Sequence, residues 1–168
     1  DVCSSDLVDY VLGSKVTGCT VADGKVVSVT VGTAGAGKEI KADAVVLAGG
    51  GFESGALKLD SHGHLHETIL DLPVTMPEGV KEEDLIHGDY WGSPQPLFLC
   101  GVEVDETMLV TYQGKPVHSN VYAAGGVIAG ATRWQEKSGE GIALGSAIKA
   151  ADAILSSVGA GAATKERN

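Results

Sequence analysis

Short apolar runs that end in glycine alternate with polar segments along the chain. Residues 44–48 form one such run, between Asp43 and three glycines, and residues 120–130 hold another, which contains Gly125 and Gly126. A continuous apolar run of this length predicts a strand buried on both faces, as in a parallel sheet. Glycines at its carboxyl end would let a backbone or a ligand approach closely.

A helical period follows the second run. Residues 139–155 place apolar side chains at i, i+4, i+7 and i+11, namely Leu144, Ile148, Ala151 and Leu155, which predicts an apolar stripe on a helix. Ala143, Ala147 and Ala150 keep another part of this helix slim enough to lie close to a sheet. We expect the last residues, 159–168, to form a flexible tail.

The N-terminal part shows a different pattern. Residues 16–21 and 26–31 are valine-rich and are joined across an Asp-Gly pair, which predicts a β-hairpin. Residues 32–37 contain several glycines, but neither Ser nor Thr follows Lys38 and no apolar helix comes next. We therefore expect a mobile hairpin loop there and not a phosphate-binding loop.

Residues 52–118 lack strong periodicity and contain all five prolines of the chain. This composition is typical of an irregular cap or insertion. Short strands are expected at residues 97–100 and 108–110, and an acidic turn or short helix at residues 78–84.

Together these patterns predict an α/β fold. Residues 8–51 and 119–158 would belong to a nucleotide-binding domain, and residues 52–118 would form a cap on its substrate side. A helix that opens with Gly139 and Gly141 offers unpaired N–H donors to an anion or to the electron-rich edge of a reduced flavin. No strand–GxGxxG–helix fingerprint is present, which fits either a truncated nucleotide-binding domain or a chain that binds no nucleotide.

The first seven residues, 1–7, form a separate case. They can be encoded by a string that resembles the end of a common sequencing adapter. We expect them to be an artefact of the library and exclude them from the fold. On this interpretation the chain is a truncated gene without its N-terminal part.

Composition limits the partners. A net charge of −10 argues against direct binding to nucleic acid or to an anionic membrane surface. No apolar stretch approaches the roughly 18 to 20 residues that a membrane span needs. The three cysteines show no metal-binding spacing, which predicts reduced thiols in a cytoplasmic protein.

Two further features could carry chemistry. His62, His64 and His66 alternate along the chain, and on an extended backbone they would lie on one side. They could form a polar loop, contact a substrate, transfer a proton or hold a metal. Arg133 is one of only two arginines, and it lies between the glycine-ended strand and the helix, where it could clamp a phosphate or carboxylate.

Four segments also carry a family resemblance. Residues 43–52 resemble the second conserved strand of FAD-dependent oxidoreductases related to fumarate reductase flavoprotein subunits. Residues 50–57, 95–107 and 120–130 are similar, in order and spacing, to the B subunits of anaerobic glycerol-3-phosphate dehydrogenases. The resemblance covers about residues 15–155 and corresponds to the C-terminal part of that longer family.

The resemblance implies an incomplete FAD/NAD(P)-binding domain of the Rossmann-like, two-dinucleotide-binding type, with FAD or FMN as cofactor and no metal ligands. In that family, the B subunit works beside a catalytic FAD subunit and an iron–sulfur subunit. The complex oxidises glycerol 3-phosphate to dihydroxyacetone phosphate and passes electrons to quinone. The protein would be cytoplasmic, and peripheral at the inner membrane through its partners.

The expected flavin contacts are backbone groups of seven residues: Gly49, Gly50, Gly125, Gly126, Gly139, Gly141 and Ile142. Arg133 and His64 are candidates for contact with the substrate or with the groups around it. The chain departs from the family pattern at residues 131–134 and 137–141, which leaves the substrate and partners open. The alternatives are a fumarate-reductase-like or ketosteroid-dehydrogenase-like FAD oxidoreductase, and a non-catalytic scaffold that keeps a flavin fold.

Overall fold

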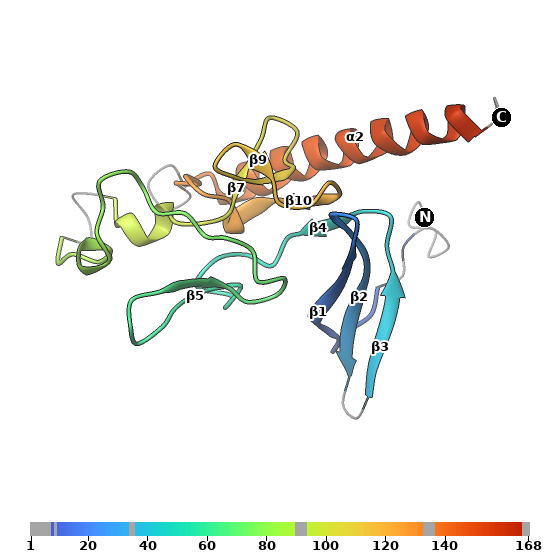
Figure 1. The fold of residues 1–168 in the computed structure, drawn as a ribbon. Helices are drawn as coiled ribbons and strands as arrows, with labels where there is room; N and C mark the ends of the chain where they lie inside the picture. The colour runs from blue at the N-terminus through green and yellow to red at the C-terminus, as the bar shows by residue number, and fades with distance from the viewer. Residues whose placement is uncertain (1–7, 9, 34–35, 90–93, 133–136, 166–168) are drawn as a thin grey trace, which may run out of the picture.

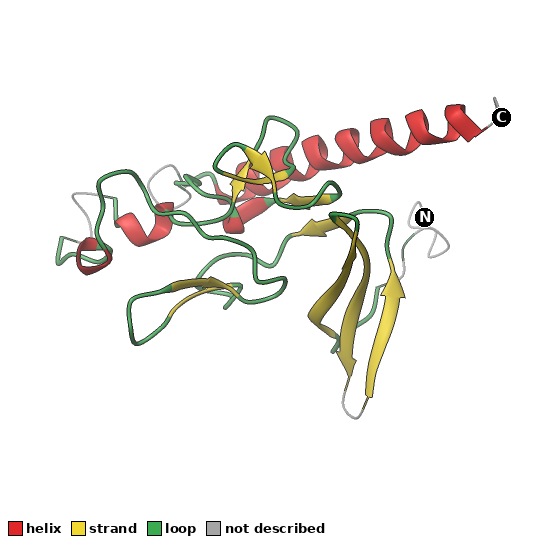
Figure 2. Cartoon of the chain, viewed as in Figure 1, coloured by secondary structure: helices red, strands yellow, loops and turns green. Residues whose placement is uncertain are grey.

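The computed structural model describes residues 8, 10–33, 36–89, 94–132 and 137–165. Within them the chain has a mixed α/β architecture of small sheets beside one long helix (Figures 1 and 2). The N-terminal sheet stands apart from the helix, and a parallel strand pair lies between the two (Figure 1).

The predicted N-terminal hairpin is confirmed. β1 (Lys15–Ala22) and β2 (Lys25–Thr33) pair antiparallel. Asp23 and Gly24 connect them with φ values of 51° and 72°, as the two central residues of a type I′ turn require. The chain then forms a third strand, β3 (Ala36–Lys41), that pairs antiparallel with β2. This strand was not predicted from the sequence.

Both glycine-ended strands are present, and they are parallel neighbours. β4 (Val45–Leu47) pairs with β10 (Val121–Ala123) in the register Val45↔Val121. All three residues of β10 are buried. The expectation of burial on both faces is wrong for β4, where Val46 is 42% exposed, because the described part of the chain leaves the face that carries Val46 largely open. In the described residues β4 also pairs with β10 alone.

The stretch between these strands is irregular, as predicted. Its elements are β5 (Leu57–Leu59), β6 (Leu65–Glu67), η1 (Glu82–Asp84), η2 (Pro96–Leu99), β7 (Glu103–Val104), β8 (Val110–Tyr112) and β9 (Lys115–Pro116). The strand expected at residues 97–100 is wrong, because Pro96 begins a 3₁₀ turn there, as its fixed φ favours. The strand expected at 108–110 begins only at Val110, since Met108 has a φ of +67°.

A short 3₁₀ turn, η3 (Gly125–Val127), follows β10, and the long helix α2 (Gly139–Lys165) comes next. The helix is confirmed, and it includes residues 159–165 of the expected tail, whose flexibility stays a prediction. The side chains of α2 that the described part of the chain buries are Ser146 and Ala150. The predicted apolar stripe is exposed instead, with Leu144 at 65% and Leu155 at 70%.

The composition of α2 corrects the expectation that no apolar stretch of the chain approaches the length of a membrane span. Its segment Gly139–Val158 has a mean hydropathy of 1.3 and is long and apolar enough, by length and composition, to cross a membrane. Only 11% of that segment is buried by the rest of the described chain. One such helix is weak evidence for a span, because core helices of soluble proteins meet the same criterion.

The hydrophobic core lies between the N-terminal sheet, the parallel pair and residues 52–118. Its buried members are Val26, Leu47, Leu57, Leu70, Leu72, Val102, Val110, Val121, Ala123 and Val127. Glu67 is also buried, and its carboxylate accepts the N–H groups of Ile69, Leu70 and Leu72. A buried carboxylate paired in this way fixes the path of the backbone that leaves β6.

One buried side chain joins the N-terminal sheet to the parallel pair. Asn120 is 4% exposed, and its Oδ1 accepts the N–H of Val26 at 2.9 Å. Its Nδ2 donates to the carbonyls of Val26 at 2.7 Å and Asp43 at 2.9 Å. The backbone carbonyl of Asn120 also accepts the N–H of Val45 at 3.0 Å. We call this set of bonds the Asn120 latch.

Replacing Asn120 with Leu should lower the free energy of unfolding by about 2 kcal/mol, because it removes the side-chain partner of the buried N–H and carbonyl of Val26 and of the part-buried carbonyl of Asp43. Urea denaturation measures the change. Thr17→Ala is the control, since the Thr17 hydroxyl donates to the Thr30 carbonyl at 3.4 Å on the surface. Equal losses in the two variants would contradict the importance of the latch.

Candidate functional site

A hollow of about 500 Å³ opens where β4, β10 and α2 meet. The carboxyl ends of the two parallel strands form one wall, and the first turns of α2 form the other. Its lining residues are Ala48, Gly50, Ala124, Gly125, Gly126, Gly139, Glu140, Ala143 and Ala147. We call it the glycine hollow. Four of the seven predicted flavin contacts, Gly50, Gly125, Gly126 and Gly139, therefore lie together.

The glycine hollow exists because small residues line it. Eight of its nine lining residues are glycine or alanine, and Glu140 brings the one ionisable side chain of that set. Gly125 is buried with a φ of +74°, a left-handed conformation that glycine adopts without strain. Ligands of open α/β sheets bind in the crevice outside the carboxyl ends of the strands, which is the place of this hollow.

The other predicted contacts lie elsewhere. Gly49 lines a second hollow of about 590 Å³ beside β4, and a Cβ on Gly49 would lie 2.7 Å from Ile69 Cδ1. Gly141 and Ile142 lie in the first turn of α2 but line neither hollow. The N–H of Ile142 donates to the Ser138 carbonyl at 2.9 Å. Arg133 lies outside the described residues.

Some lining residues were not predicted as contacts. Ala48, Ala124 and Glu140 were missed, and Ala143 and Ala147 were expected only to lie close to a sheet. The spacing of Ala143 and Ala147, four positions apart on one helix face, was the signal that could have placed them beside a ligand.

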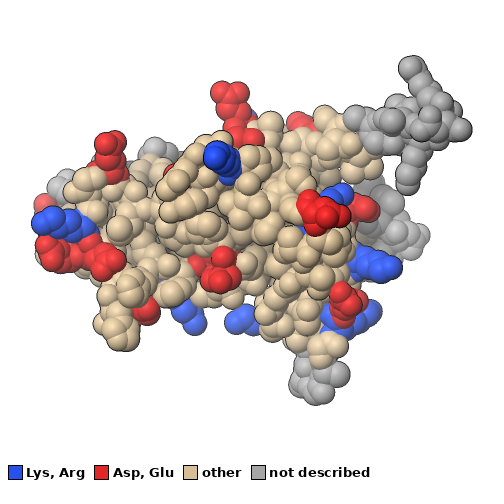
Figure 3. Space-filling model, viewed as in Figure 1, with Lys and Arg blue, Asp and Glu red and all other residues tan. Residues whose placement is uncertain are grey.

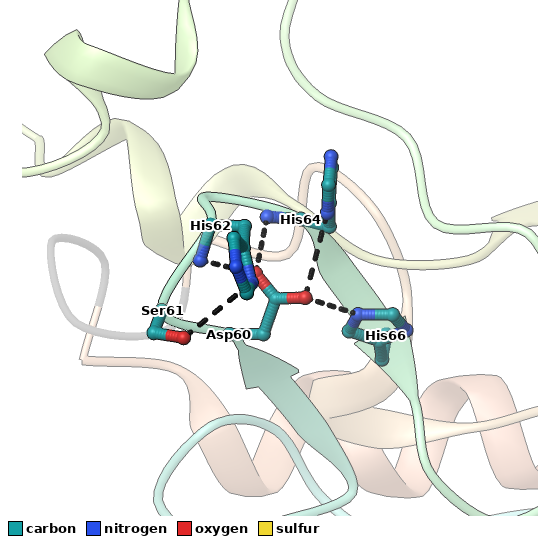
Figure 4. A network of polar contacts seen from close by, with 5 residues as sticks. All are labelled: Asp60, Ser61, His62, His64 and His66. Atoms are coloured by element: carbon teal, nitrogen blue, oxygen red, sulfur yellow. Dashed lines mark hydrogen bonds and ion pairs between the residues drawn. The ribbon is translucent and has the colours of Figure 1, made fainter.

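His64 lies in the hairpin of β5 and β6, outside both hollows, in a network around Asp60 (Figure 4). Asp60 Oδ1 accepts the backbone N–H groups of His62 at 2.8 Å and His64 at 2.9 Å. Asp60 Oδ2 lies 3.1 Å from His66 Nε2 and 3.4 Å from His64 Nδ1. Two hydrogen bonds hold the pKa of Asp60 well below its usual range. The bond with the His66 ring has the larger effect, and the bond from the backbone N–H of His64 has the next largest.

This network corrects the picture of three imidazoles on an extended strand. Residues 60–64 form a turn, so the histidines surround a carboxylate. Asp60 was missed from the sequence, although an Asp that leads into Ser-His-Gly is typical of an Asx turn. Within the described residues, no group of three or more His, Cys, Asp or Glu side chains could hold a metal ion.

Cys19 and Cys100 are free thiols. Burial raises the pKa of Cys100 to about 11. Burial and, secondarily, the charge of Glu67 also raise the pKa of Cys19. Because the thiolate is the reactive form, neither thiol has the character of a nucleophile at neutral pH. On the face drawn in Figure 3, charged side chains are scattered and form no basic patch.

Comparison with known proteins identifies the family. The family described as "FAD binding domain" matches residues 5–142. This chain belongs to the FAD binding domain family. The match includes β4, β10 and the start of α2, and therefore most of the glycine hollow.

The curated relatives of this chain share about a third of its residues over the aligned part. The B subunit of the anaerobic glycerol-3-phosphate dehydrogenase of Haemophilus influenzae (strain PittEE) is 31% identical over 122 residues, which are 70% of this chain and 27% of the relative. The protein of the same name from Yersinia pestis bv. Antiqua (strain Antiqua) is 32% identical over 118 residues, 70% of this chain and 26% of the relative. The chain thus spans about a quarter of the length of these relatives. No solved structure matches it.

The family implies FAD as the cofactor, and the glycine hollow fits the flat ring system of FAD. A flat ring system needs two walls with few projecting side chains, and apart from Glu140 both walls of the hollow consist of glycine and alanine. Its volume lies within the range of about 300–1,000 Å³ found for ligand pockets. The first turn of α2 adds backbone N–H groups that have no partner inside the helix.

The Asp60 network should respond to acid. A lowered pKa means that Asp60 adds stability above its unfolded pKa of about 3.9 and loses that contribution as the pH falls toward the lower folded value. The difference in thermal stability between the wild type and Asp60→Asn should therefore shrink from pH 6 to about pH 3, as measured by circular dichroism.

Asp105→Asn is the matched control. Asp105 Oδ1 also accepts N–H groups, from Thr107 and Leu109, but no histidine contacts it. An acid-independent difference for Asp60→Asn, with unchanged His66 chemical shifts, would contradict the stabilising role of the Asp60 network.

Proposed function

We propose that this chain is the C-terminal, flavin-facing part of a flavoprotein subunit of an anaerobic glycerol-3-phosphate:quinone oxidoreductase. The observation that carries the proposal is the glycine hollow, which gathers two glycine-ended parallel strands and a helix start within a match to the FAD binding domain family. The names of the relatives supply the specific complex.

The backbone around the hollow would hold the flavin, FAD by family or FMN. Gly50, Gly125 and Gly126 would lie along one side of the ring system, and Gly139 with the first turn of α2 along the other. The N–H groups and the partial positive charge at the start of α2 favour an electron-rich ligand edge. The bound flavin supplies the redox chemistry, and the protein supplies binding, orientation and electrostatics.

The surfaces of this chain suit only a part of such a domain. Val46 of β4 is 42% exposed, whereas parallel sheets are normally covered on both faces. Leu144, Ile148 and Leu155 of α2 are more than half exposed. A Rossmann-like N-terminal part, present in a longer protein, would cover them and grip the nucleotide phosphates. This chain alone would then bind flavin poorly.

The partners follow from the same proposal. The protein would work with a catalytic FAD subunit and an iron–sulfur subunit, convert glycerol 3-phosphate to dihydroxyacetone phosphate, and pass electrons to quinone. It would be cytoplasmic and held at the inner membrane by its partners. Arg133 and His64 stay candidates for substrate contact, and the exposed hairpin of His64 makes it the weaker of the two.

The test begins with the full gene, recovered from longer sequencing reads. The longer protein, purified anaerobically with its partner subunits, should show flavin absorption near about 450 nm and reduce a quinone analogue when glycerol 3-phosphate is added. Flavin absorption with no response to glycerol 3-phosphate would favour an FAD oxidoreductase of another substrate. A colourless protein that neither FAD nor FMN reconstitutes would overturn the proposal.

A substitution that fills the hollow gives a second test. Ala143→Phe places a ring between the two walls, so the affinity for flavin should fall roughly tenfold or more, as measured by quenching of flavin fluorescence in the longer protein. Ala22→Phe, at the exposed end of β1, makes the same change in volume away from the hollow. Equal affinities in the two variants would contradict the assignment of the glycine hollow.

A further inference from the structure

The hydroxyl of Ser146 hydrogen-bonds to both walls of the glycine hollow, although Ser146 is not itself one of the lining residues. Its Oγ accepts the backbone N–H of Gly125 at 2.9 Å. The same Oγ lies 2.5 Å from the Ile142 carbonyl and 3.2 Å from the Ala143 carbonyl, to which it can donate. Ser146 is 8% exposed. One side chain thus bonds to the turn after β10 and to the first turns of α2.

Other serines of α2 differ from Ser146. Ser156 Oγ donates to the Asp152 carbonyl at 2.8 Å, and Ser157 Oγ donates to the Ile154 carbonyl at 2.7 Å. Both are exposed, and such bonds back to the preceding turn are ordinary in helices. Ser146 makes the same bond and in addition accepts an N–H group from a residue 21 positions earlier.

The bond reaches a well-fixed part of the first wall. The N–H of Ala124 donates to the Leu47 carbonyl of β4 at 2.9 Å, and the Gly125 carbonyl accepts the N–H of Ile128 at 3.2 Å. The buried turn at Gly125 is therefore tied to β4 on one side and to Ser146 on the other. The Ser146 bond spans the separation between Gly125 and the first turns of α2.

We propose that Ser146 is a positioning residue for the flavin, which rests on the function proposed above. It holds the glycine turn and the first turns of α2 at the separation that admits the ring system. The role needs a group that donates and accepts at once, because the proton goes to the helix carbonyl while a lone pair receives the Gly125 N–H. Threonine keeps this ability and alanine removes it.

The first experiment needs no flavin. Hydrogen–deuterium exchange of the Gly125 amide is measured by NMR in this chain and in the variants Ser146→Ala, Ser146→Thr and Ser156→Ala. Loss of one buried hydrogen bond should speed exchange at Gly125 roughly tenfold in Ser146→Ala. The other two variants should match the wild type. Unchanged exchange in Ser146→Ala would overturn the proposal.

The second experiment uses the longer, flavin-loaded protein. Ser146→Ala should shift the flavin absorption and fluorescence spectra and weaken flavin binding roughly tenfold. Ser146→Thr should keep the wild-type spectra and affinity, and so should Ser156→Ala. Faster exchange at Gly125 with an unaltered flavin spectrum and affinity would make the bond purely structural and overturn the positioning role.

The two proposals fail in different ways. A wild-type protein that binds no flavin would overturn the proposed function, and the positioning role with it, whatever the exchange result at Gly125. A wild type that binds flavin, together with Ser146→Ala of equal affinity and spectrum, would overturn the positioning role alone.

Discussion

The buried amide side chain of Asn120 bonds the N-terminal sheet to the parallel strand pair. The Asn120 latch ties β2 to the backbone that enters β4, while the carbonyl of the same residue pairs with β4 itself. The parallel strands are only three residues long, and so short a pair does not persist without packing on other elements. The latch places the antiparallel sheet against the pair, so that Val26, Leu47 and Val121 share one core.

Once the parallel pair is in register, the hollow follows from the sequence of each strand end. Both strands run into glycine at the same edge, and α2 presents alanine to that edge. The proposed site therefore exists because its lining residues have small side chains or none, which leaves backbone groups exposed and the volume open. Positions where side chains are absent set the shape of the site, and Ser146 adds a hydrogen bond that joins its two walls.

Local signals predicted the parts of this structure that depend on local geometry. The Asp23-Gly24 turn, the two glycine-ended strands and the start of α2 were all found from neighbouring residues. The parts that depend on distant contacts were not. The buried face of α2 follows Ser146 and Ala150 because the described chain packs against that side, while the more apolar stripe at Leu144 and Ile148 meets no partner within it. The histidines turn around Asp60 because a side-chain carboxylate competes with strand pairing for their N–H groups.

The large separation along the chain between Asn120 and its partners also affects the order in which the parts of the structure can form. Asn120 bonds to residues 94 and 77 positions earlier, so the pairing of β4 with β10 that the structure describes forms only after synthesis has passed β10. The hairpin of β1 and β2, closed by a two-residue turn, needs no such wait and folds from local contacts. During translation the apolar run at β4 therefore stays without β10 while residues 52–118 are made. An apolar strand that waits for its partner is open to wrong strand pairing and aggregation.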